Sequence, residues 1–221
     1  MVQIENYIVQ MIGLLQEQFD SRLLYVGLQG SYLRGEANDN SDIDIMVVID
    51  ELSAEDLASY RSILQSMGHF ELSCGFICGK QDLEHWNPLE IHHVLHSTKD
   101  YYGTLQHLVP IYTEQDIRNF VKISVNNLYH QICHHYIHAD NNRCLKNLSG
   151  AYKGVFFILQ NLHYLTCGVF AATKAELLQV LEGKDRAVLA QSLALSSGKD
   201  CGFEESFDLL FTWCQETMCA L

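Results

Sequence analysis

Two aspartates separated by one residue open an apolar stretch of the chain. Asp42 precedes and Asp44 lies within residues 43–49, which are rich in β-branched side chains and typical of a buried strand. Residues two apart on a strand point to the same face, so the two carboxylates should lie side by side. The two carboxylates repel each other unless a cation lies between them, and Mg²⁺ is the ion that we expect there. The pattern therefore predicts a Mg²⁺ site that can also bind substrate phosphates.

A Gly-Ser pair precedes these aspartates and ends the short apolar run 23–28. Gly30 lets a phosphate approach the backbone closely. Ser31 offers a hydroxyl and a backbone N–H at the start of a short helix. We therefore expect Gly30 and Ser31 to bind phosphate.

The segment 30–44 combines both features in one loop. It reads Gly30-Ser31, then Arg34-Gly35-Glu36-Ala37, then Ser41-Asp42-Ile43-Asp44. This pattern resembles the signature of the nucleotidyltransferase superfamily with the DNA polymerase β-like fold. Among its members, the loop is most similar to those of aminoglycoside nucleotidyltransferases and minimal nucleotidyltransferases. The order of predicted helices and strands fits that fold across residues 1–113.

The resemblance implies which residues form the site. A third carboxylate is expected on the next strand, where Glu71 is the best candidate; a solvent-facing glutamate on an edge strand is the alternative. One or two Mg²⁺ ions would then bind to the catalytic carboxylates Asp42, Asp44 and Glu71. Glu71, Asp44 or an acid of the helical half would accept the proton of the acceptor hydroxyl. The nucleotide-binding residues implied are Gly30, Ser31, Arg34, Ser41 and Lys153, although Lys153 is equally well explained as an ordinary surface lysine.

The resemblance also implies a reaction, the transfer of AMP from ATP to an acceptor hydroxyl. Residues 1–113 have a net charge of −11, which would attract a cationic acceptor such as an aminoglycoside. Antibiotic resistance is the role that this acceptor suggests. Two alternatives are a protein adenylyltransferase of the antitoxin type and a non-catalytic nucleotide-binding module. The fused helical half favours a small-molecule enzyme, and the presence of both Asp42 and Asp44 argues against a non-catalytic module.

Hydrophobic periodicity predicts the elements that position these residues. In the first half, helices and strands alternate, which indicates a mixed α/β sheet. The expected elements are a helix over 3–19, strands over 23–28, 43–49 and 69–78, a weaker strand over 89–95, and a helix starting at Ser53.

The second half is predicted to be all helical. Apolar periodicity extends over 115–138 and 144–168, and further helices start near Thr173, Asp185 and Gly202. The overall class is therefore α+β: a catalytic domain over residues 1–113, followed by an antiparallel helical bundle over 114–221 that binds the acceptor. His130, His134 and His138 share one helix face, which we interpret as a polar stripe bordering the acceptor groove rather than a zinc site.

The amino-acid composition limits the class of protein to which the chain can belong. The 221 residues include 27 acidic and 14 basic side chains, for a net charge of −13, and 48% are apolar. Such a chain is globular, and its acidity disfavours nucleic acid as a partner. No apolar run approaches the roughly 20 residues of a membrane span, and no secretory signal opens the sequence. Eight cysteines without a C-x-x-C pair fit a reduced, cytoplasmic protein.

Overall fold

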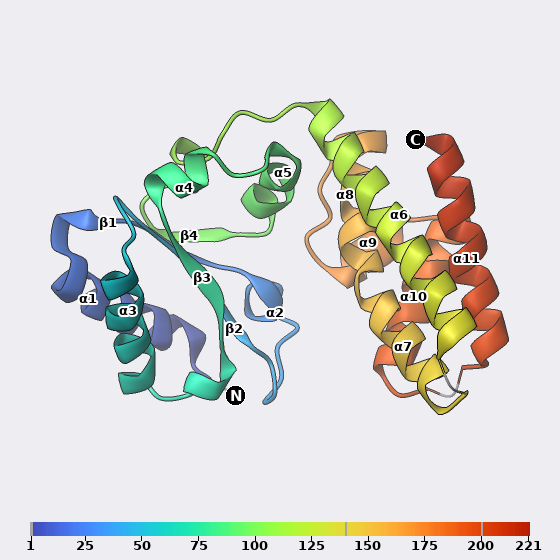
Figure 1. The fold of residues 1–221 in the computed structure, drawn as a ribbon, viewed down its shortest axis with the longest axis horizontal. Coiled ribbons are helices and arrows are strands. Elements are labelled where there is room, and N and C mark those ends of the chain that lie inside the picture. The colour runs from blue at the N-terminus through green and yellow to red at the C-terminus, as the bar shows by residue number, and fades with distance from the viewer. Residues whose placement is uncertain (1, 140, 200) are drawn as a thin grey trace. The chain divides into compact units, whose positions relative to one another are not determined.

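The structure, a computed structural model, describes residues 2–139, 141–199 and 201–221. It divides into two compact units, Met1–Ile111 and Tyr112–Leu221. The first unit contains a mixed sheet with helices, and the second contains helices (Figure 1). The predicted α+β class is confirmed.

A four-stranded sheet forms the centre of the first unit. Its order is β3-β2-β1-β4, with β1 antiparallel to β2 and β4, and with β2 parallel to β3. The strands are β1 (Leu23–Leu28), β2 (Ile43–Ile49), β3 (Ser73–Gly79) and β4 (Lys99–Tyr102). The loop that carries the aspartate motif therefore connects the two central strands.

Helices cover both faces of this sheet (Figure 1). α1 (Ile4–Phe19) and α3 (Ala54–Ser66) pack on the face that receives the odd-numbered residues of β2, such as Ile45. α4 (Lys80–Glu84) and α5 (Pro88–His96) pack on the opposite face, against Met46 and the other even-numbered residues. Because side chains alternate along a strand, Asp44 belongs to the α5 face.

The helix predicted to start at Ser53 is confirmed, and its N-terminus is capped by side chains. The Asp56 backbone N–H donates to Ser53 Oγ at 3.2 Å, and the Ser53 backbone N–H donates to Asp56 Oδ2 at 2.9 Å. This reciprocal arrangement satisfies backbone donors that the first turn of a helix leaves without partners. The predicted helix over 3–19 is also confirmed as α1.

Two predicted strands require correction. The strand expected over 69–78 begins only at Ser73, because a 3₁₀ helix (Phe70–Leu72) precedes it. Residues 89–95 belong to α5, not to a strand, since the Asn87 side chain caps this helix and Pro88 occupies its first position.

The histidines of α5 therefore lie on a helix. The ring centroids of His92 and His96, one helical turn apart, are separated by 4.3 Å.

Strand β4 has no counterpart among the predicted elements. It is a four-residue edge strand, and its sequence, Lys99-Asp100-Tyr101-Tyr102, lacks an apolar alternation. Pairing with β1 stabilises it, and the Tyr25 hydroxyl donates a 2.6 Å hydrogen bond to Asp100 Oδ1. Only tertiary contacts, which the local sequence does not encode, make this segment a strand.

The second unit is a bundle of helices. Its long α6 confirms the helix predicted over 115–138, whereas the stretch 144–168 forms two helices instead of one. The helix is interrupted at Gly154, whose backbone N–H donates to the Ala151 carbonyl three residues back. The described helices are α6 (Glu114–His138), α7 (Asn141–Lys153), α8 (Val155–Cys167), α9 (Lys174–Val180), α10 (Gly183–Ser196) and α11 (Phe203–Ala220).

Buried hydrogen bonds join three of these helices. The fully buried Tyr152 of α7 donates its hydroxyl to the Ser206 carbonyl of α11 at 2.7 Å. Its own carbonyl accepts from Ser192 Oγ of α10 at 2.9 Å. These bonds fix the helices around an apolar core that includes Phe156 and Trp213. Across the described ranges, no helix combines the length and apolar character needed to traverse a bilayer.

Candidate active site

The turn after β1 places Gly30 against Asp44. The Gln29 backbone N–H donates to the Asp44 carbonyl at 2.8 Å, and the short helix α2 (Gly30–Leu33) follows. Gly30 has a φ of +70°, and a Cβ added to it would lie 1.9 Å from Asp44 Oδ2. Glycine is thus required here both for its backbone conformation and for the space that the carboxylate occupies.

Asp42 and Asp44 form the carboxylate pair that the sequence predicts. Burial raises the pKa of the half-buried Asp44, and the charge of Asp42 raises it further. A hydrogen bond from Cys74 and the charge of Arg34 act in the opposite direction. The ionised pair is consequently unfavourable in the folded chain, and a bound cation would stabilise it.

Arg34 brings positive charge near this pair. Only 15% of its side chain is exposed, and its Nε donates to Glu36 Oε2 at 3.1 Å. Its charge also acts on His93 of α5, whose pKa is lowered to about 4 by burial first and by the nearby His92, Arg34 and His96. His93 is therefore neutral at physiological pH, and Arg34 supplies the positive charge on this side of the aspartate pair.

The two serines of the motif lie at either end of the loop. Ser31 belongs to α2 and is partly exposed. Ser41 Oγ accepts the Asn38 backbone N–H at 2.8 Å, which closes the turn that leads into Asp42. Ser41 therefore has a local structural role, and its contact with a nucleotide stays a prediction.

Glu71 does not reach the strand position beside Asp44. It is exposed in the 3₁₀ helix that precedes β3, and the β3 residue level with Asp44 is Cys74. Within the described part of the chain, no three His, Cys, Asp or Glu side chains are grouped to bind a metal. Asp42 and Asp44 nevertheless fit Mg²⁺, which proteins usually bind through one or two carboxylates together with phosphates and water.

The remaining predicted residues belong to the second unit. Lys153 is exposed at the end of α7, and its assignment to the nucleotide stays a prediction. His130, His134 and His138 lie on one exposed face of α6, with ring centroids 6.3 Å and 4.7 Å apart along the series.

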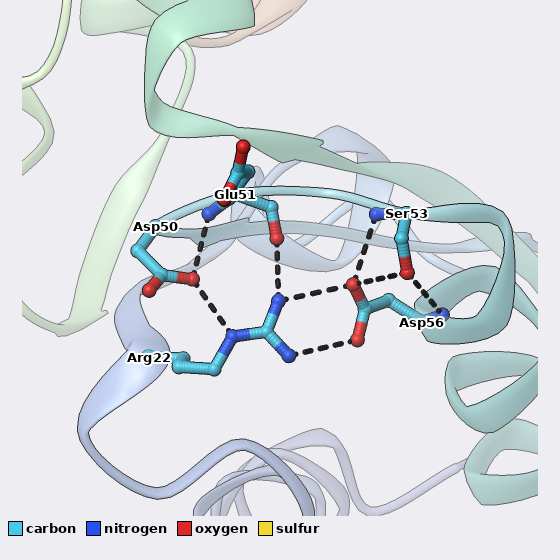
Figure 2. A network of polar contacts seen from close by, with 5 residues as sticks. All are labelled: Arg22, Asp50, Glu51, Ser53 and Asp56. Atoms are coloured by element: carbon cyan, nitrogen blue, oxygen red, sulfur yellow. Dashed lines mark hydrogen bonds and ion pairs between the residues drawn. The ribbon is translucent and has the colours of Figure 1, made fainter.

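A second cluster of acids lies at the other end of β2 and has a different environment. Figure 2 shows Arg22 between Asp50 and Asp56, with Nε donating to Asp50 Oδ1 at 2.9 Å and two further N–H groups donating to both oxygens of Asp56. The hydrogen bonds from Arg22 hold the pKa of Asp56 well below its usual range, assisted by Ser53. Through Arg22, which balances their charge, these carboxylates connect the residue before β1 to the N-terminus of α3.

Comparisons with known families and solved structures found similar proteins. Residues 11–90 match the sequence profile of the nucleotidyltransferase domain family. A spectinomycin adenyltransferase from Enterococcus faecialis, solved with ATP and spectinomycin, is 14% identical with a TM-score of 0.61, covering 97% of this chain and 99% of its own. A toxin–antitoxin structure solved with AMP-PNP is 22% identical with a TM-score of 0.33, covering 60% of this chain and 94% of its own. No curated protein matches the chain.

The profile match spans β1, β2 and β3, and it includes the Gly30–Asp44 loop. The likeness to the spectinomycin adenyltransferase extends over nearly the whole of both chains, so the helical second unit is part of the shared fold. Residues 11–90 therefore match a nucleotidyltransferase domain, and the chain as a whole shares the fold of the spectinomycin adenyltransferase.

Proposed function

We propose that the chain is a Mg²⁺-dependent enzyme that transfers AMP from ATP to a hydroxyl group of a small molecule. One observation carries this proposal. The charge of Asp42 acts on the half-buried Asp44, and the Asp44 carboxylate lies against Gly30, within the residues that match the nucleotidyltransferase domain. A half-buried carboxylate beside a second one has little structural value, but it suits a site that binds a cation and phosphates.

Asp42 and Asp44 are the residues that would bind Mg²⁺. When bound, the ion neutralises negative charge on the reacting phosphate. The protein groups around it bind and orient the substrates. Gly30 and Ser31 would approach the phosphates, and Arg34 would balance the charge of the departing pyrophosphate. Ser41 closes the loop turn and so maintains the position of Asp42.

The acceptor hydroxyl must lose a proton, and Asp44, Glu71 and an acid of the second unit are candidates for the base. Glu71→Gln tests one of them. If Glu71 is the base, the variant should lose roughly 10²- to 10⁴-fold in turnover with an unchanged KM for ATP. If the variant retains wild-type turnover, Asp44 and the acids of the second unit remain. Glu71 is exposed, so its replacement should leave folding intact.

We assign acceptor binding to the second unit and propose an aminoglycoside-like molecule as the acceptor, with Lys153 assisting the triphosphate. The likeness to a spectinomycin adenyltransferase over 97% of the chain and the acidity of the first unit support this assignment. A cationic acceptor should bind less tightly as salt increases, because opposite charges across a wet surface are screened beyond about 10 Å at 0.1 M.

The test is a transfer assay with the purified full chain, ATP and Mg²⁺. Candidate acceptors are spectinomycin and a panel of aminoglycosides, and the readouts are pyrophosphate release and the mass of an AMP-modified product. Product formation that falls with salt supports the proposal. Modification of proteins alone, or ATP binding without turnover for every acceptor, would overturn it. Asp44→Asn provides the inactive control.

A further inference from the structure

Cys74 lies directly beside Asp44 in the sheet. In the parallel pairing of β2 with β3, Asp44 is level with Cys74, and Met46 is level with Phe76. Phe76 and Met46 pack in the same cluster on the α5 face. Because side chains alternate along each strand, the Cys74 thiol and the Asp44 carboxylate therefore project on one face as nearest cross-strand neighbours.

The backbone after Cys74 prevents this neighbour from shifting. Gly75 has a φ of +102°, and a Cβ added to it would lie 2.3 Å from the Ile45 carbonyl oxygen. Strands β2 and β3 thus approach each other closely at Ile45 and Gly75. These residues directly follow Asp44 and Cys74. Any larger residue at position 75 would push β3 away from Asp44.

Polar contacts complete the arrangement. The Cys74 thiol lowers the pKa of Asp44, and burial first, then the Asp44 charge, raises the pKa of Cys74, so the two groups interact. On the opposite side, the Cα of Gly30 limits the space for Asp44. The carboxylate consequently lies between Gly30 on the β1 side and the Cys74 thiol on the β3 side.

We propose that Cys74 is a positioning residue that fixes the Asp44 carboxylate in the orientation required to bind a divalent cation together with Asp42. This inference rests on the proposed function, since it takes Asp44 as a metal ligand. Partners that hydrogen-bond to a metal-binding carboxylate set its orientation, and their removal typically lowers metal affinity or activity about 10- to 100-fold. A thiol is a weak donor, so we expect roughly tenfold, the lower end of that range.

The experiment measures the binding of Mn²⁺ alone to the full chain, by the electron paramagnetic resonance signal of free Mn²⁺, without nucleotide or acceptor. Cys74→Ala removes the donor, and Cys74→Ser replaces it with a hydroxyl. The matched control is Ser73→Ala, which changes the preceding residue on the opposite face of β3, where the Ser73 hydroxyl lies 3.4 Å from Tyr7 Oη. Thermal melting of each variant in EDTA reports its folding.

We expect Cys74→Ala to weaken Mn²⁺ binding about tenfold, and Cys74→Ser and Ser73→Ala to bind as the wild type does. Wild-type affinity in Cys74→Ala, an equal loss in Cys74→Ser, or no Mn²⁺ binding by the wild-type chain would overturn the proposal. A transfer assay of the wild type keeps the two proposals apart: absence of AMP transfer to every acceptor, with the Mn²⁺ results as expected, refutes the proposed function but leaves the positioning role intact.

Discussion

The two ends of strand β2 carry similar residues in opposite electrostatic states. At its start, Asp44 is half-buried beside Asp42, and burial raises its pKa. At its end, Asp50 and Asp56 accept hydrogen bonds from Arg22, which lower the pKa of Asp56 (Figure 2). The first pair belongs to the strand and the loop before it, and the second pair to the turn after the strand and the first turn of α3.

The difference separates carboxylates that stabilise the fold from the pair for which we propose a chemical role. Asp56 is stabilised by its ion pair and by the N-terminus of α3, so its charge contributes to folding. Asp44 costs the fold stability when it is ionised, because burial and Asp42 both disfavour its charge. A folded protein keeps such an unfavourable group where function requires it.

The largest effect is expected for Asp44→Asn, with Asp50→Asn as the matched control at the other end of the strand. An amide cannot supply the charge that a metal ion requires, so AMP transfer should fall by at least about a hundredfold. Asp50→Asn should retain the wild-type rate. Equal activity in Asp44→Asn and the wild type would show that Asp42 and Asp44 have no chemical role, and the proposed difference between the two ends of β2 would be wrong.

A smaller loss of activity is expected for Ser31→Ala. The variant lacks the hydroxyl but keeps the backbone donors, and one hydrogen bond to a charged phosphate contributes about 1.5–3 kcal/mol, which corresponds to roughly 10- to 100-fold in ATP affinity. Titration with ATP measures the effect. Ser62→Ala, on the exposed side of α3, is the control and should bind ATP normally. Unchanged affinity in Ser31→Ala would mean that α2 does not contact the phosphates.

At the structural end of the strand, Ser53→Ala should reduce stability and not chemistry. Loss of a helix N-cap typically costs about 1 kcal/mol. For a chain of this size, the melting temperature should therefore fall by about 2–4 °C. The transfer rate per folded molecule should stay at its wild-type value. A loss of rate without a loss of stability would show that this end of β2 also takes part in the reaction.

The pH dependence of stability should have opposite signs at the two ends, as urea unfolding in EDTA would measure. The lowered pKa of Asp56 stabilises the folded state at neutral pH, and this stability is lost as the pH falls below about 4. The raised pKa of Asp44 destabilises the folded state at neutral pH, and the cost disappears as the pH falls through that pKa. At pH 7, Asp44→Asn should be more stable than the wild type and Asp56→Asn less stable. Parallel pH profiles of the two variants would contradict this assignment.

The local sequence determined much of the first unit. The β-branched, apolar side chains of residues 43–49 and the spacing of Asp42 and Asp44 predicted a buried strand with paired carboxylates, because strand geometry requires only the chain itself. Ser53 with acidic residues in the next turn, and the capping-box spacing of Thr173 and Glu176, predicted helix starts for the same reason, since these groups lie within one turn.

Other features depend on residues that are distant in the chain. The sequence does not indicate that Cys74 is level with Asp44, because that register results from the packing of β3 on β2. It also placed Glu71 on a strand, whereas the 3₁₀ helix before β3 leaves this residue outside the pair. The ion pairs of Arg22 with Asp50 and Asp56 join residues about 30 positions apart. Local patterns therefore predicted the chemistry that we propose, and tertiary packing decided which groups surround each charge, because burial and cross-strand contacts exist only in the folded chain.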